Sequence, residues 1–200
     1  LKSKDFDAAR PVYQMHWGGG TPTYYSDAEL TELWFEIGRH FHLVEPERGE
    51  YSIEIDPRTI DGNKLGLLKG LGFNRISLGI QDFDQRVQEA INRVQSYEQI
   101  RDLLQAARNY QYRSVNFDLI YGLPYQTVAS VRETITKVID LSPDRISLFN
   151  YAHLPQRFKS QSLLPEEALP PAEEKLQILC DASNQLMNAG YVYIGMDHFA

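Results

Sequence analysis

Short runs of β-branched and aromatic residues alternate along the chain with longer segments of helical periodicity, and this alternation constrains the fold most. A period of two predicts strands, and a period of 3.6 predicts amphipathic helices that pack on them. Alternating strands and helices build a parallel sheet from βα units of about 30 residues. We therefore predict an α/β fold with six parallel strands, at residues 12–17, 51–55, 75–80, 115–121, 145–151 and 191–196.

Helix-capping signals and apolar stripes place five helices between these strands. Ser26 and Glu29 have the S-x-x-E spacing of a capping box, and apolar residues repeat at helical spacing behind them. The sequence predicts this helix to about residue 41, others at 65–71, 97–107 and 131–139, and a last one from 170–171 to 189. The stretch from about 153 to 169 is predicted to be irregular, as functional loops often are.

The composition limits the classes of function. Two hundred residues with 42% apolar and 24% charged residues fit one globular domain. The single cysteine, Cys180, excludes an internal disulfide, and its place on the apolar face of the last helix predicts a buried, inert thiol. A net charge of −7 disfavours nucleic-acid partners. Residues 1–10 lack the apolar part of a secretory signal and no stretch could span a membrane, so we expect a cytoplasmic protein.

Polar and glycine residues follow the predicted strands, where a parallel sheet or barrel places its ligands. In chain order they are Gly18, Gly19, Gly20 and Thr21, then Glu54 and Asp56, then Gln81 and Asp82, then Asp118, then Asn150, Tyr151, Ala152 and His153, and finally Asp197 and His198. This arrangement predicts a small-molecule site at one rim of the sheet. It does not by itself indicate a reaction.

Each of these features also has a purely structural explanation. The three glycines suit either a ligand approaching the backbone or a plain tight turn. Glu54 and Asp56 form either a carboxylate pair at the site or a solvated, helix-capping strand end. Asp118 lies in an apolar strand, which indicates either a ligand contact or a buried ion pair. For His16, His153 and His198, a hydrogen-bonded structural role explains the residue better than catalysis does.

Several strings resemble the radical S-adenosylmethionine (SAM) superfamily and, within it, the oxygen-independent coproporphyrinogen III oxidase family of haem biosynthesis. The first two are MHWGGGTPTY at 15–24 and IEIDPR at 53–58. The others are GFNRISLGIQDF at 72–83, NR at 92–93, DLIYGLP at 118–124, FNYAHLP at 149–155 and GMDHFA at 195–200. The resemblance covers nearly the whole chain in order.

The resemblance implies a partial (β/α)6-type radical-SAM barrel, incomplete at both ends in this chain. It implies an enzyme with a 4Fe–4S cluster and two SAM molecules, in which a 5′-deoxyadenosyl radical removes a β-hydrogen from a propionate. Loss of CO2 and one electron then leaves a vinyl group, and two such events convert coproporphyrinogen III to protoporphyrinogen IX. The family's porphyrinogen substrate, an electron-donor protein and a monomeric state are expected with it.

The matching positions also imply where the two SAM molecules bind. Those that would line the methionine portion of the bound cofactors are Gly19, Gly20 and Thr21. Glu54 would hold the cluster-bound SAM through its ammonium or ribose hydroxyls. Those that would hold the second molecule are Gln81, Arg93, Asp118 and Ala152. Tyr151, His153 and the loop after them would lie near the porphyrinogen.

One feature departs from the family pattern. The family holds its cluster with three cysteines in a C-x3-C-x2-C run, and Cys180 matches none of these positions. We therefore expect residues 1–200 to be a single radical-SAM core fragment, without metal ligands, cluster loop or C-terminal domain, and inactive alone. Two alternatives stay open: a related haem chaperone that binds haem without oxidase activity, and an unrelated βα-barrel aldolase or phosphate-binding enzyme.

Overall fold

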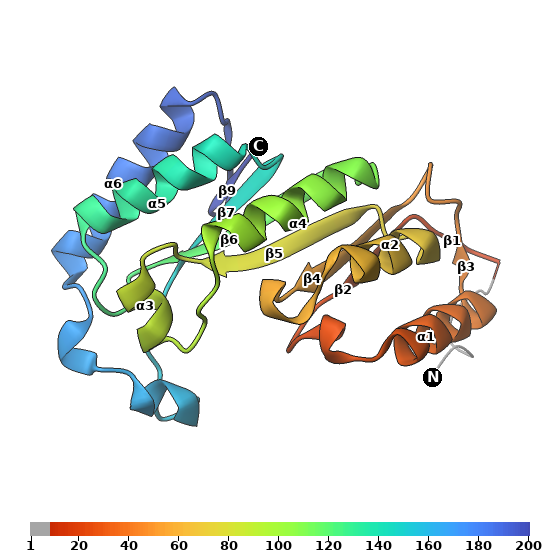
Figure 1. Ribbon diagram of the computed structural model, residues 1–200, viewed down its shortest axis with the longest axis horizontal. Helices are drawn as coiled ribbons and strands as arrows, with labels where there is room; N and C mark the ends of the chain where they lie inside the picture. Colours follow the sequence, from red (N-terminus) through yellow and green to blue (C-terminus); the bar gives the residue numbers. More distant parts are fainter. Residues whose placement is uncertain (1–8) are drawn as a thin grey trace. The chain divides into compact units, whose positions relative to one another are not determined.

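A computed structural model describes residues 9–200. The prediction that residues 1–10 contain no secretory signal therefore falls mostly outside the described residues, which include only residues 9 and 10 of that segment. Strands and helices alternate along the chain as expected (Figure 1). The chain divides into two compact units, one with residues up to 78 and 102–115, the other with 79–101 and 116–200. Within the described range, no helix combines the length and apolarity that crossing a membrane requires.

The first unit contains three parallel strands in the order β2-β4-β5. They are β2 (Gln14–Trp17), β4 (Glu50–Ile55) and the first part of β5 (Arg75–Gln81). Its helices are α1 (Asp27–His40), α2 (Gly62–Leu71) and most of α4 (Tyr97–Asn109), with the short 3-10 helices η2 (Pro22–Tyr24) and η3 (Pro57–Thr59). A separate parallel pair joins β1 (Pro11–Val12) to β3 (His42–Leu43), so the predicted strand 12–17 is broken at residue 13.

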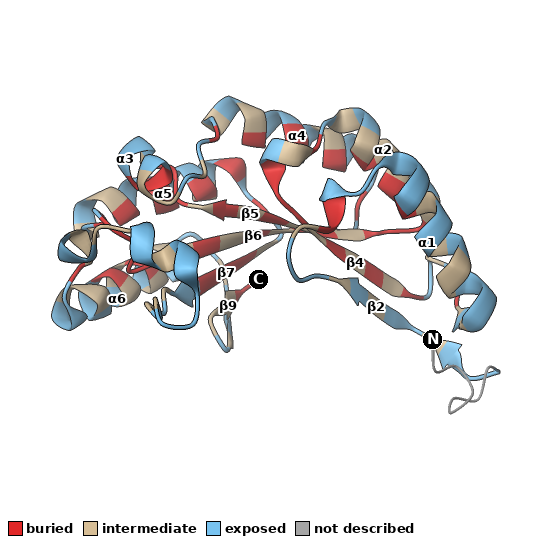
Figure 2. Ribbon diagram, turned by 90° about the horizontal axis from the view of Figure 1, so that it is seen from below, coloured by how far each residue is buried: buried red, intermediate tan, exposed pale blue. Residues whose placement is uncertain are grey.

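Aromatic side chains fill the core between the strands and helices of this unit. The ring of Trp34, on α1, lies 4.8 Å from that of Phe73 and 5.7 Å from that of Tyr51. Along β4, buried residues alternate with half-exposed Glu50, Ser52 and Glu54 (Figure 2). One face of β4 therefore packs under the helices, and its other face presents polar side chains.

The second unit contains most of β6 (Ser114–Tyr121), with β7 (Arg145–Asn150), β8 (Tyr193–Gly195) and β9 (His198–Phe199), in the order β6-β7-β9-β8. Its helices are α3 (Gln85–Ala90), α5 (Val128–Leu141) and α6 (Ala172–Asn188), with η4 (Lys159–Leu163) and η5 (Glu166–Ala168) in the predicted irregular stretch. The parallel pair β6-β7 runs in the register Phe117↔Ile146 to Tyr121↔Asn150.

The prediction of a sixth parallel strand at 191–196 is wrong. Met196 and Asp197 both have positive φ, at 48° and 65°, and this tight turn folds the chain into the hairpin β8-β9. β9 pairs antiparallel with β7 and separates β8 from it. Asp197 and His198 therefore lie in a hairpin and not at the end of a parallel strand.

The prediction of a buried Cys180 is also wrong, since the thiol is exposed on α6. This helix buries a narrow stripe of Ile178, Ala182 and Leu186, spaced by one turn each. Cys180 lies two residues after Ile178, which turns it by about 200° away from the stripe. Leu176 and Met187, two apolar residues of the same helix, are exposed with it.

Candidate functional site

Three consecutive glycines follow β2, and the structure requires glycine there for two different reasons. Gly19 and Gly20 have φ of +80° and +64°, a conformation that disfavours side chains. At Gly18 a Cβ atom would lie 2.6 Å from Nε2 of His16 and 2.7 Å from Oε1 of Glu54. This glycine loop lines a cavity of about 660 Å³ together with Thr21. The positive φ values confirm the turn, and the cavity beside it leaves room for a ligand.

Glu54 reaches the glycine loop from the neighbouring strand. Its Oε2 accepts a 3.0 Å hydrogen bond from the amide of Gly19, and its Oε1 lies 3.2 Å from Nε2 of His16. The other ring nitrogen of His16 lies 2.8 Å from Oγ of Ser52, which is its register partner on β4. The Glu54 side chain is still 44% exposed. A carboxylate that is held in place but accessible can accept further hydrogen bonds from a cationic or hydroxylated ligand.

Asp56 does not form a carboxylate pair with Glu54. β4 ends at Ile55, and Asp56 is buried at the start of η3, where it accepts the amide of Arg58. The guanidinium of Arg58 also binds this carboxylate, at 3.0 and 2.7 Å. Of the two explanations given for Asp56, helix capping is correct. The period of two that predicted Glu54 and Asp56 on one face applies only within β4, and Asp56 lies beyond its end.

A second cavity, of about 260 Å³, lies in the other unit and brings together two predicted site residues. Gln81, at the end of β5, and Arg93, before α4, both line it. The rest of its lining consists of Ile91, Ile120, Leu123, Tyr151, Ser160, Gln161 and Leu164. Four of these nine residues are aliphatic, and the others include one arginine and two glutamines.

The other two residues predicted for this site lie differently. The carbonyl of Ala152 accepts a 3.1 Å hydrogen bond from Nε2 of Gln161, whose Oε1 accepts the amide of Leu154 at 2.5 Å. Gln161 therefore fixes the backbone on both sides of residue 153. Asp118 is half-buried and accepts a 2.8 Å hydrogen bond from Nδ2 of Asn116, but it does not line the cavity.

Asp82, expected among the rim residues, is fully buried instead. Its carboxylate accepts hydrogen bonds from Oγ1 of Thr134 and Nε2 of Gln126, both at 2.5 Å, and from the amide of Asp84 at 2.8 Å. Burial raises the pKa of Asp82, and these donors oppose the rise. Ile76, Leu78 and Ile80 are the buried residues of β5, so Asp82 continues the same period of two and lies on the buried side.

The Asp82 network extends to the loop after β6. Gln126 also donates to the carbonyl of Ile120 at 2.9 Å and accepts the amide of Leu123 at 2.8 Å. Both Ile120 and Leu123 line the second cavity. Sequence reasoning missed Gln126 and Gln161, because no local sequence pattern identifies a glutamine whose side chain forms hydrogen bonds with the backbone of a loop.

The remaining histidines have structural partners, as expected. Nδ1 of His153 lies 3.2 Å from the hydroxyl of Tyr151, and Nδ1 of His198 lies 2.5 Å from the carbonyl of Met196. Within residues 9–200, no group of three or more His, Cys, Asp or Glu side chains is placed to hold a metal ion.

Comparison with known proteins agrees with these features. Residues 2–138 match the radical SAM superfamily. The chain is 52% identical over 200 residues to an oxygen-independent coproporphyrinogen III oxidase of Pseudomonas aeruginosa and 48% identical over 194 residues to one of Synechocystis. It covers 44% and 41% of the lengths of these relatives.

The fold also closely resembles that of a solved structure. The structure of coproporphyrinogen III oxidase from Escherichia coli, described as a radical SAM enzyme, superimposes with a TM-score of 0.93 at 47% identity. The match covers 96% of this chain and 44% of that one. The architecture is therefore the partial radical-SAM barrel that the sequence predicted.

Proposed function

Because the chain belongs to the radical SAM superfamily, we propose that it forms the SAM-binding core of an oxygen-independent coproporphyrinogen III oxidase. In this proposal the parent enzyme converts two propionates of coproporphyrinogen III to vinyl groups. The observation that carries it is the Glu54 carboxylate, hydrogen-bonded to the Gly19 amide beside a glycine-lined cavity. The similarity at about half identity over the whole chain supports the same family.

The residues around the glycine loop fit a SAM molecule. When bound there, SAM would supply, on reductive cleavage, the radical that abstracts the propionate β-hydrogen. Glu54 would accept the ammonium or the ribose hydroxyls, and its bonds to Gly19 and His16 hold it in place before the ligand arrives. Gly19 and Gly20 leave open space where a Cβ would lie, so the backbone at this point can approach the methionine portion closely.

The second cavity fits one end of a second SAM molecule. The guanidinium of Arg93 can bind the methionine carboxylate through two parallel hydrogen bonds. Gln81 lines the same cavity, and Gln161 orients the backbone at Ala152. Asp118 would accept the ammonium.

The residues described here do not fit a 4Fe–4S cluster. The single cysteine is exposed on α6, and the described part of the chain brings no three ligand side chains together. We assign no step of the reaction to a cluster held by these residues. In the proposal, the cluster ligands belong to the parent protein outside residues 1–200, and residues 1–200 alone form a single core without activity.

The proposal includes the partners and location of the parent enzyme. Its substrate is a porphyrinogen, its electrons come from a donor protein, and it works as a monomer in the cytoplasm. The net charge of −7 supports the absence of nucleic-acid partners, and no membrane partner is proposed.

Anaerobic turnover of the full-length protein tests this function. With its cluster loaded, a reductant and SAM, it should convert coproporphyrinogen III to protoporphyrinogen IX and release CO2. Omission of SAM should abolish both products. CO2 release that does not depend on SAM would contradict the proposal, as would stable haem binding by a protein that leaves coproporphyrinogen unchanged.

A further inference from the structure

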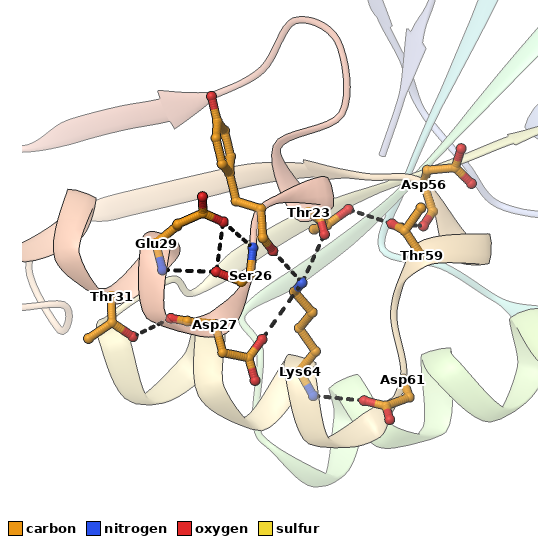
Figure 3. Close-up of polar contacts among 10 residues, drawn as sticks. Thr23, Ser26, Asp27, Glu29, Thr31, Asp56, Thr59, Asp61 and Lys64 are labelled. Atoms are coloured by element: carbon orange, nitrogen blue, oxygen red, sulfur yellow. Dashed lines mark hydrogen bonds and ion pairs between the residues drawn. The ribbon is translucent and has the colours of Figure 1, made fainter.

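Lys64, on α2, contacts the segment that follows the glycine loop (Figure 3). Its Nζ donates hydrogen bonds to the carbonyl of Thr23 at 2.9 Å and to that of Tyr25 at 2.7 Å. The side chain is only 15% exposed, and its nearest carboxylate oxygen, on exposed Asp27, lies 3.7 Å away. A largely buried ammonium is therefore satisfied mainly by the carbonyls of one loop, which it holds together.

A pair of threonines ties the same segment to the connection after β4. Oγ1 of Thr23 lies 2.7 Å from Oγ1 of Thr59, and the Thr59 hydroxyl donates to the carbonyl of Asp56 at 2.9 Å. Since that bond uses the single Thr59 proton, Thr23 is the donor between the two hydroxyls. Thr23 is fully buried, so this tie is shielded from water.

These ties and Glu54 come from one continuous part of the chain. Glu54 accepts a hydrogen bond from Gly19 in the glycine loop. Thr59 bonds Thr23, and Lys64 bonds Thr23 and Tyr25, in the segment that follows this loop. The loop between these points includes the two glycines with positive φ, which have little conformational restraint of their own. A capping box at Ser26 and Glu29 fixes the other end of the segment, where α1 begins.

We propose that Lys64 is a positioning residue, which holds the glycine loop at the distance from Glu54 that SAM binding requires. This inference deepens the function proposed above and rests on it. Lys64 does not touch the ligand in this account. It acts through the carbonyls of Thr23 and Tyr25, and its loss would let the loop move away from the carboxylate.

Lys69 provides a matched control on the same helix. Its Nζ also donates to a backbone carbonyl, that of Gln111 at 2.8 Å, but this carbonyl is remote from the glycine loop in the sequence and does not line its cavity. Lys64→Met removes two bonds to backbone carbonyls, and Lys69→Met removes one such bond and a contact with the ring of Tyr112, at a similar cost in helix propensity. A general loss of stability should affect both variants, whereas loss of loop position should affect only the first.

The test measures the dissociation constant of SAM by equilibrium dialysis with the full-length, cluster-loaded protein. We expect Lys64→Met to raise it by about tenfold, Lys64→Arg to restore part of the affinity, and Lys69→Met to leave it within about twofold of wild type. SAM should also raise the Tm of the Lys69→Met protein more than that of the Lys64→Met protein. Wild-type affinity in Lys64→Met, or equal loss in both variants, would overturn the inference.

Two further variants separate the possible failures. If Lys64→Met does not fold, Thr59→Val removes the other tie and should weaken SAM binding in the same direction. Unchanged affinity in Thr59→Val would then overturn the inference. If the wild-type protein binds no SAM, the proposed function itself fails. If wild type binds SAM and Glu54→Gln weakens it while Lys64→Met does not, only the role of Lys64 fails.

Discussion

The amide of Gly19 donates a 3.0 Å hydrogen bond to the carboxylate of Glu54, although 35 residues separate them in the sequence. The parallel pairing of β2 with β4 makes this contact, because it sets the end of one strand beside the end of the next. The same carboxylate also contacts His16, on β2. The glycine loop and its acidic residue are thus assembled by strand register before any ligand binds.

Gly18→Ala should disrupt this arrangement and weaken SAM binding by more than about tenfold. The new Cβ would lie 2.6 Å from Nε2 of His16 and 2.7 Å from Oε1 of Glu54, so one of these side chains must move. Equilibrium dialysis with SAM checks the affinity. Gly38→Ala, on the exposed side of α1 with open space for its Cβ, is the control and should bind SAM normally. Normal SAM binding by the Gly18→Ala protein would show that SAM binding does not depend on the observed positions of His16 and Glu54.

Asp82→Asn should destabilise the protein at neutral pH by about 1–3 kcal/mol. Asp82 accepts hydrogen bonds from Thr134 and Gln126, and an asparagine amide group would face one of these donors with a donor of its own. Denaturant unfolding of the full-length protein measures the change. Asp61→Asn, at the exposed N-cap of α2, is the control, because asparagine caps helices as well as aspartate does.

The same residue should make stability depend on pH. Burial raises the folded-state pKa of Asp82 above its ordinary value of 3.8, so the native state binds this proton more tightly than the unfolded state. The free energy of unfolding therefore decreases as pH rises from about 4 through the folded-state pKa. Unfolding series in this window should show that contribution in wild type and lack it in Asp82→Asn. An identical pH dependence in both proteins would contradict this role for the carboxyl group.

Gln161→Leu should weaken one of the two proposed SAM sites and leave the other intact. The leucine loses both bonds that fix the backbone at Ala152 and Leu154. Dialysis at saturating and limiting SAM should then show one site with unchanged affinity and one weakened by about tenfold. Gln185→Leu, which loses hydrogen bonds to Thr136 and Arg132, is the control outside the cavity. Wild-type SAM affinity at both sites in the Gln161→Leu protein would contradict this role for Gln161.

Local sequence signals predicted the parts of the fold that local interactions determine. The capping box at Ser26 and Glu29 is present, α1 begins at Asp27 directly after Ser26, and all five predicted helices and the first five strand regions occur. The sequence also placed the glycine loop and Glu54 at the ends of neighbouring strands, where the structure has them, because glycine and acidic residues after a strand can be recognised without a structure. The partial barrel followed from the resemblance of the motifs and not from periodicity.

The features that sequence reasoning missed depend on tertiary geometry. The sequence does not show that Lys64 reaches the carbonyls of Thr23 and Tyr25, or that Lys69, on the same short helix, reaches that of Gln111. Cys180 was predicted to be buried because many residues of α6 are apolar, but the helix buries only the stripe Ile178, Ala182 and Leu186. Asp82 was expected at the rim because it directly follows β5, and the sequence does not show that Gln126 and Thr134 donate to it in the interior.

The most direct test of the account compares SAM binding by full-length, cluster-loaded wild-type, Glu54→Gln and Glu50→Gln proteins. Glu50 lies on the same face of β4, where it pairs with Arg75 at 2.6 Å, away from the glycine loop. We predict that Glu54→Gln raises the dissociation constant of one SAM molecule by at least about tenfold, while Glu50→Gln binds SAM as wild type does. Wild-type SAM affinity in the Glu54→Gln protein would contradict the central claim.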